Sequence, residues 1–143
     1  MNIRIMNISD YEAVFNLWSS CSGMGLNNLD DSRDGIERFL QRNPDCCCVA
    51  EANGKITGVV MAGHDGRRGH IYHMAVAPDY RRQKVGSMLL NSALSALFKQ
   101  GIHKVALVVF ESNTDGNAFW ENHGFTSRED LIYRNRNIEP TDS

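Results

Sequence analysis

Several kinds of segment are missing from this sequence, and each absence excludes a class of protein. No apolar run approaches the roughly 20 residues of a membrane-spanning helix. The formal net charge is only −2, so nothing general points to nucleic acid or an anionic membrane as a partner. Residues 1–6 lack the basic and then apolar layout of a signal peptide. We therefore expect a cytoplasmic protein that binds neither nucleic acid nor membrane.

Metal-binding and disulfide patterns are missing too. Cys21 stands alone and the other cysteines form the run 46–48, spacings that match neither a zinc site nor a disulfide framework. The run favours a buried strand filled with small apolar side chains. We expect a reducing compartment and no metal.

Repeats, low-complexity tracts and linkers rich in Pro, Gly or Ser are also absent, so we expect one domain over residues 1–143. A domain of this length buries roughly 70% of the surface that its unfolded chain exposes, and it needs no disulfide or metal to fold.

Hydrophobic periodicity predicts an alternation of helices and strands. Ser9 and Asp10 offer N-cap chemistry for a first helix, and Asn43-Pro44 ends a second. Asn53-Gly54 between two apolar runs is a strong hairpin signal. The expected helices cover residues 11–18, 36–42, 85–100 and 113–123, and the expected strands cover residues 2–6, 46–52, 55–62, 70–77, 105–110 and 132–136.

The order of these elements predicts an α/β protein with a mixed sheet. Strands joined by hairpins pair antiparallel, and strands joined by helices pair parallel. The run Val105–Phe110 is apolar without alternation, which is typical of a strand covered on both faces.

The stretch Tyr80–Ser87 follows an expected strand and begins an expected helix. The first turn of a helix has backbone N–H groups without partners and about half a positive charge from the helix dipole. Arg81 and Arg82 add full charges, and Gly86 lets a ligand approach the backbone closely. On these residues alone, a phosphate or pyrophosphate site and a solvated basic turn both stay open.

Together with its neighbours, this stretch resembles the acetyl-CoA loop of the GNAT superfamily of acetyltransferases, Arg/Gln-x-x-Gly-x-Gly/Ala. Arg81 matches the first position and Gly86 the last, and residues 74–81 are similar to the family's usual lead-in. A second block at the family's spacing, an Asn-led helix ending in Gly-Phe, runs from Asn113 to Phe125. The resemblance covers nearly the whole chain. It implies the GNAT fold, a mixed sheet of six to seven strands with helices on both faces, and acetyl transfer from acetyl-CoA to a small-molecule or peptide amine.

The resemblance also assigns residues to acetyl-CoA, position by position. The strand backbone, at Met74 and Val76 above all, is expected to bind the acetyl and pantetheine part. The loop amides are expected to cradle the pyrophosphate, and residues of the second block should line the far side of the channel. The full expected set is Met74, Ala75, Val76, Arg81, Arg82, Gln83, Lys84, Val85, Gly86, Ser87, Asn113, Phe119 and Trp120.

Two residues depart from the family pattern. Lys84 stands where the family usually has its first Gly, and if that position needs a positive φ, Lys incurs a strain of about 1 kcal/mol. Its ammonium then either pairs with a phosphate or points to water. Trp120 stands where many members have the Tyr that protonates the departing CoA thiolate, and an indole cannot supply that proton. A thiol of pKa roughly 8.5 is a tolerable leaving group without it.

His70 is the expected general base, because an imidazole exchanges protons near neutral pH. It precedes Tyr72 by two residues on one strand, so their side chains share a face. The pair is similar in position to the two catalytic histidines of the arylalkylamine acetyltransferases, which implies that Tyr72 orients the proton relay. The alternative is that His70 merely begins the strand at the surface. His73 is expected on the opposite face as a packed residue, and Glu111 is a second candidate for the base.

The acceptor is left open by the sequence. In the family its pocket is built largely from the first two helices and their connecting loop, where Asp30 and Asp31 would favour a cationic amine. The alternative is that Asp30, Asp31 or Ser32 caps the second helix. Trp120 and the lack of an unambiguous Glu base leave open a second function, a non-catalytic acyl-CoA-binding regulatory module, and Lys84 leaves open a third, an interaction protein with a degenerate loop. The family often forms dimers through edge strands, and a homodimer stays open here.

Overall fold

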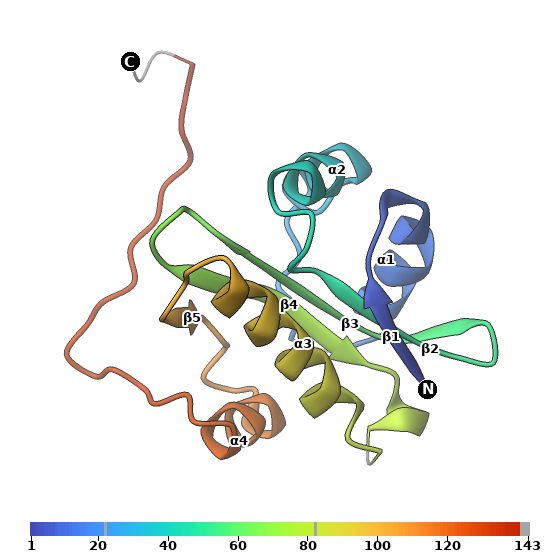
Figure 1. Ribbon diagram of the computed structural model, residues 1–143. Coiled ribbons are helices and arrows are strands. Elements are labelled where there is room, and N and C mark those ends of the chain that lie inside the picture. The colour runs from blue at the N-terminus through green and yellow to red at the C-terminus, as the bar shows by residue number, and fades with distance from the viewer. Residues whose placement is uncertain (22, 82, 141–143) are drawn as a thin grey trace. The chain divides into compact units, whose positions relative to one another are not determined.

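The computed structural model describes residues 1–21, 23–81 and 83–140 (Figure 1). The chain divides into two compact units, Met1–Phe110 and Glu111–Ser143, and each is described by itself. The described part of the second unit, residues 111–140, contains the helix α4 (Thr114–Asn122). The first unit contains, in order, β1 (Asn2–Ile5), η1 (Ile8–Asp10), α1 (Tyr11–Ser20), α2 (Arg33–Arg42), β2 (Cys48–Ala52), β3 (Lys55–His64), β4 (Gly69–Val76), η2 (Pro78–Tyr80), α3 (Val85–Lys99) and β5 (Val105–Leu107).

The five strands form one mixed sheet in the order β1-β2-β3-β4-β5. The first three pairs are antiparallel, and β4 pairs parallel with β5, to which α3 connects it. Asn53 and Gly54 join β2 to β3 with φ values of 54° and 75°. Two positive φ values are the signature of the tight turn that Asn-Gly favours. The predicted hairpin and mixed sheet are therefore confirmed.

Helices cover both faces of this sheet, as predicted (Figure 1). On one face, α1 and α2 bury a core that includes Trp18, Ile36, Val59 and Met61. On the other face, α3 lies so close to β3 that a Cβ on Gly58 would stand 2.9 Å from Leu89 Cδ1. The small residue in the strand thus sets the distance between the sheet and α3.

The helix ends agree with the local signals except at the first helix. α2 ends just before Asn43, and α3 ends just before Gln100 and Gly101. The first cap, however, is Asn7 rather than Ser9 or Asp10. The Asn7 side chain accepts the Ser9 N–H at 3.0 Å, and the Asp10 carboxylate accepts the Asn7 N–H at 2.9 Å. This reciprocal cap adds the short helix η1 before α1.

Two expected strands differ from the structure. β5 has three residues rather than six, and Val108 and Phe110 beyond it are 57% and 56% exposed, so the expectation of burial on both faces is wrong. The reason is that the pairing of β5 with β4 ends at Leu107, so Val108 and Phe110 lie beyond the strand and outside the sheet whose faces the helices cover. No strand forms over 132–136, and the segment is not paired with any of the five strands. The described sheet therefore has five strands, not six or seven.

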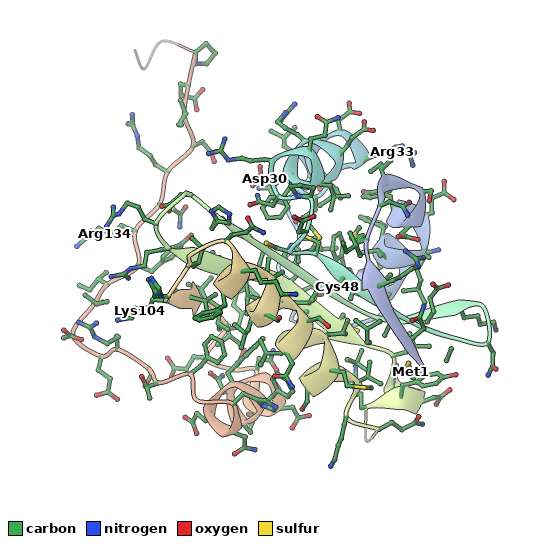
Figure 2. The ribbon with its side chains drawn as sticks, in the orientation of Figure 1. Met1, Asp30, Arg33, Cys48, Lys104 and Arg134 are labelled. Atoms are coloured by element: carbon green, nitrogen blue, oxygen red, sulfur yellow. The ribbon has the colours of Figure 1, made fainter. Side chains whose placement is uncertain are left out.

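The run of three cysteines is buried, as predicted. β2 begins only at Cys48 (Figure 2). Burial raises the pKa of the Cys47 thiol to about 12, so this thiol stays protonated and packs as a small apolar group. Within the described ranges, no helix combines the length and apolar character needed to cross a membrane. The same ranges contain no group of three or more His, Cys, Asp or Glu side chains placed to hold a metal ion.

Candidate active site

β4 and β5 separate soon after they meet. Only Gly69–Ile71 of β4 pair with Val105–Leu107 of β5, whereas β4 continues to Val76. Within the described residues, the edge of β4 from His73 onward therefore has no strand partner on the β5 side. An unpaired strand edge offers backbone N–H and C=O groups to an extended ligand.

The direction of the β4 backbone can be read from its neighbours. The Ala77 N–H donates to the Thr57 carbonyl of the β3 side at 2.8 Å. Because backbone groups alternate between the two edges along a strand, Val76 and Met74 direct theirs away from β3. Arg81 agrees with this, since its Nε–H donates to the Val76 carbonyl oxygen at 3.0 Å. Met74 and Val76 are the two residues whose backbone was expected to bind pantetheine, whereas Ala75 faces β3.

The loop before α3 ends in a left-handed residue. Lys84 has φ 62° and ψ 21°, so the positive φ on which its strain depends is confirmed. The Lys84 carbonyl accepts the Met88 N–H at 3.1 Å, which is the first hydrogen bond of α3. The amides of Val85, Gly86 and Ser87 therefore lie in the first turn, where the helix dipole is positive. This geometry suits the expected pyrophosphate.

The side chains of the loop mainly hold the loop in place. Arg81 also lies against α1, with its Nη2 3.7 Å from Cys21 Sγ, so its guanidinium ties the loop to β4 and α1. The side-chain amide of Gln83 donates a hydrogen bond to the backbone carbonyl of Asp79 at 3.3 Å. Val85 is buried and its side chain belongs to the core. Arg82, which was expected to add charge and an amide here, lies outside the described residues.

A β-bulge in β4 changes which side chains share a face. Met61 of β3 pairs with His73 and Ala62 pairs with Ile71, so β4 contains one residue more than β3 at this point, Tyr72. An extra residue interrupts the alternation of a strand. His73 therefore lies on the same face as His70, where it contacts Trp18 of α1. The expectation that His73 points to the opposite face is wrong for this reason.

His70 and Tyr72 are neighbours, as the sequence predicted. Their ring centroids are 4.4 Å apart, and Phe39 of α2 meets Tyr72 edge-on at 5.3 Å. His70 is half-buried and Tyr72 is exposed. Burial lowers the pKa of His70 from its ordinary value, because desolvation disfavours the imidazolium. The neutral, proton-accepting form of His70 therefore persists to lower pH than in an exposed histidine.

Sequence reasoning did not foresee that Asp31 and His73 form a pair. His73 Nε2 lies 2.9 Å from Asp31 Oδ1, and the side chains are only 12% and 9% exposed. The α2 cap is Ser32, whose Oγ accepts the Gly35 N–H at 3.1 Å, so one of the three capping candidates is confirmed. Asp31 is thus neither a cap nor an open acidic group, while Asp30 is exposed before α2 (Figure 2).

The second unit contains the three residues expected at the far side of the channel. Asn113 begins α4, and its side chain accepts the Gly116 N–H at 3.0 Å. Phe119 and Trp120 meet edge-on at 5.0 Å, and Trp120 packs against Phe125 at 5.2 Å. The predicted helix is confirmed, and within this unit the three residues cap it and form an aromatic cluster.

Comparison with known proteins agrees with this geometry. The sequence model of the acetyltransferase (GNAT) family matches residues 11–125. An acetyltransferase of Pectobacterium atrosepticum is 41% identical over 113 residues, which are 79% of this chain and 79% of that protein. Two solved structures have a similar fold. Ard1 of Thermoplasma volcanium has a TM-score of 0.77 at 23% identity and covers 87% of this chain and 82% of its own. The PaiA N-acetyltransferase of Thermoplasma acidophilum, in complex with coenzyme A, has a TM-score of 0.76 at 19% identity, with 89% and 90% covered. The chain therefore belongs to the acetyltransferase (GNAT) family, as one of its N-acetyltransferases.

Proposed function

We propose that this chain transfers the acetyl group of acetyl-CoA to a primary amine, by direct attack of the amine on the thioester. One observation carries the proposal: the unpaired edge of β4 at Met74 and Val76 precedes the loop that leads into the first turn of α3. The edge offers hydrogen bonds to a pantetheine arm, and the helix start offers amides to a pyrophosphate. The complex of PaiA with coenzyme A supports this assignment.

His70 is the general base of the proposed reaction. A primary amine of pKa roughly 10.4 is mostly protonated near neutral pH, so a proton must leave before it attacks. Burial lowers the pKa of His70 and keeps its ring neutral, so it can accept that proton directly or through water. A new C–N bond forms, the C–S bond breaks with its electron pair going to the sulfur, and the nitrogen loses its second proton to solvent water as the amide forms.

Backbone groups and Tyr72 complete the proposed site. The carbonyl oxygen of the thioester gains negative charge during attack, and a backbone N–H on the open edge near Met74 stabilises it. Tyr72 lies against His70 and orients the proton relay. Since the indole of Trp120 cannot act as an acid, coenzyme A leaves as the thiolate.

Calorimetric titration with acetyl-CoA tests the binding half of the proposal. We expect saturable binding by the wild-type protein. Gly86→Trp should weaken binding at least about tenfold, because the new side chain occupies the place of the pyrophosphate. Lys99→Trp, at the exposed far end of α3, is the matched control and should bind normally. Unchanged affinity in Gly86→Trp would overturn the loop assignment.

Release of free coenzyme A tests the catalytic half. The probe amines are a peptide with an N-terminal alanine, Nα-acetyl-lysine, spermidine and kanamycin. Acetyl-CoA-dependent release with at least one of them is the expected result. Tight binding of acetyl-CoA without release in any case would instead favour a non-catalytic binding module.

A further inference from the structure

The Asp31–His73 pair is a closed polar site inside the core that α1 and α2 form on the sheet. Trp18 of α1 covers His73 with its ring, at a centroid distance of 5.0 Å. Burial raises the pKa of Asp31, but hydrogen bonds from His73 and from the Asn27 amide outweigh it, and the pKa lies below its ordinary value. An ionised carboxylate can only accept, so His73 Nε2 carries the proton of this bond.

The same carboxylate shapes the loop that precedes α2. Asp31 Oδ2 accepts the Asn27 N–H at 2.8 Å, and the Asn27 side chain accepts the N–H groups of Leu29 and Asp30, both at 2.9 Å. Tyr11 of α1 donates its O–H to the Asp31 carbonyl at 2.6 Å. Residues 27–31 are therefore tied to α1 at one point and to β4 at another.

The tie to β4 lies at the bulge. His73 directly follows Tyr72, so the loop is anchored one residue from the His70–Tyr72 pair. Phe39 of α2 also contacts Tyr72. α3, in contrast, packs on the opposite face of the sheet. A change at the anchor would therefore displace the loop relative to Tyr72 and leave the start of α3 in place.

We propose that Asp31 and His73 are positioning residues for the amine acceptor, because together they hold the 27–31 loop beside Tyr72. The inference rests on the proposed function and adds to it. The pair itself contacts no reacting atom. It fixes the position of the 27–31 loop, which in this proposal forms part of the acceptor site. Loss of the pair should therefore weaken use of the amine while acetyl-CoA still binds.

Steady-state kinetics of Asp31→Asn test this inference, with the probe amine that the wild-type protein acetylates best among the four named above. We expect the KM for the amine to rise about tenfold and kcat to fall by no more than about threefold. The calorimetric Kd for acetyl-CoA should stay within about twofold of the wild-type value. Asp34→Asn removes an exposed carboxylate in the first turn of α2 and should match the wild type.

A second pair of variants separates positioning from general loosening of the fold. His73→Gln keeps an N–H donor for Asp31 and should retain most of the wild-type KM, whereas His73→Leu should not. If Asp31→Asn fails to fold, Asp31→Asn/His73→Leu takes its place, because it removes the bond between the two residues and leaves no buried charge without a partner. An unchanged amine KM, or an equal loss of acetyl-CoA affinity, would overturn the inference and leave the proposed function intact. Absence of turnover by the wild type with all four probes would overturn the proposed function itself, and the inference with it.

Discussion

The imidazole of His70 lies against the phenol ring of Tyr72 with ring centroids 4.4 Å apart, beside the only bulge between β3 and β4 in the described residues. The bulge brings His73 to the same face. Two imidazoles and a phenol within four residues thus adjoin the unpaired edge of β4. The half-buried imidazole of His70 is suited to proton transfer, whereas the imidazole of His73 is hydrogen-bonded to Asp31.

Replacement of His70 by glutamine should reduce kcat/KM for the amine by about 10²- to 10⁴-fold, the usual contribution of a general base. The pH profile is the more specific readout. Burial lowers the pKa of His70 below its ordinary value of 6.5, so wild-type activity should decline only below that pH as the ring gains a proton. In His70→Gln this decline should disappear, as measured from about pH 5 to about pH 9.

The matched control for this prediction is His103→Gln, which removes an exposed imidazole before β5. It should leave both the rate and the pH profile as they are. If the profile of His70→Gln overlays that of the wild type, the base lies elsewhere.

The sequence predicted those parts of the fold that depend on neighbouring residues. Asn53-Gly54 gives a tight turn because both residues adopt positive φ. Lys84 was recognised as a residue out of place, and its left-handed backbone follows from the turn that starts α3. Such signals lie within a few residues of the feature that they specify, which is why one sequence is enough to find them.

Features that depend on distant partners were not predicted. A bulge adds one residue without changing the apolar pattern around it, so the sequence of residues 70–77 does not indicate that Tyr72 is the extra residue of a bulge. Asp31 and His73 are 42 residues apart, and no local pattern joins them. Ile132 and Tyr133 favour a strand over residues 132–136, but a strand also needs a partner edge, and composition does not supply one.

Lys84→Gly tests the cost of the left-handed residue. An L-residue with a Cβ incurs about 1 kcal/mol in this conformation, whereas Gly incurs none, although Gly also gains entropy in the unfolded chain. We expect Lys84→Gly to change the free energy of unfolding by at most about +1 kcal/mol, and Lys84→Ala to change it by much less. Urea unfolding of the three proteins measures this order, and a more stable Lys84→Ala would contradict it.

The same two variants show what the Lys84 ammonium does. If it pairs with a phosphate of acetyl-CoA, both variants should bind acetyl-CoA several-fold more weakly, and the loss should diminish at high salt. If it points to water, both should bind as the wild type does. Calorimetric titration at low and high salt distinguishes the two.

Gly58→Ala should disturb the contact between the sheet and α3. The new Cβ would lie 2.9 Å from Leu89 Cδ1, 3.1 Å from Val85 Cγ1 and 3.3 Å from the Ala75 carbonyl oxygen. Overpacking of this kind costs about 1–3 kcal/mol. Because Val85 begins α3, acetyl-CoA binding should weaken as well. Leu89→Ala makes room for the methyl group, so the double variant should lose less stability than the sum of the two single variants. Strict additivity would show that Leu89 is not the obstacle.

Asp10 should make the fold sensitive to acid. Two hydrogen bonds from the Arg4 guanidinium, at 2.8 and 2.9 Å, lower the pKa of Asp10 despite its burial, and the Asn7 amide lowers it further. A carboxyl group whose pKa is lower in the folded than in the unfolded state stabilises the fold. This contribution is fully present above the unfolded pKa of about 3.9, and it is lost as the pH falls through the folded pKa. Asp10→Asn should be less stable near neutral pH by about 1–3 kcal/mol and should show a shallower decline below about pH 4. Urea unfolding from about pH 6 to about pH 2.5 measures both effects, and Glu129→Gln, which removes an exposed carboxylate outside the helices and strands, should match the wild-type stability near neutral pH. Parallel curves for Asp10→Asn and the wild type throughout that range would show that Asp10 does not take up the proton that destabilises the fold.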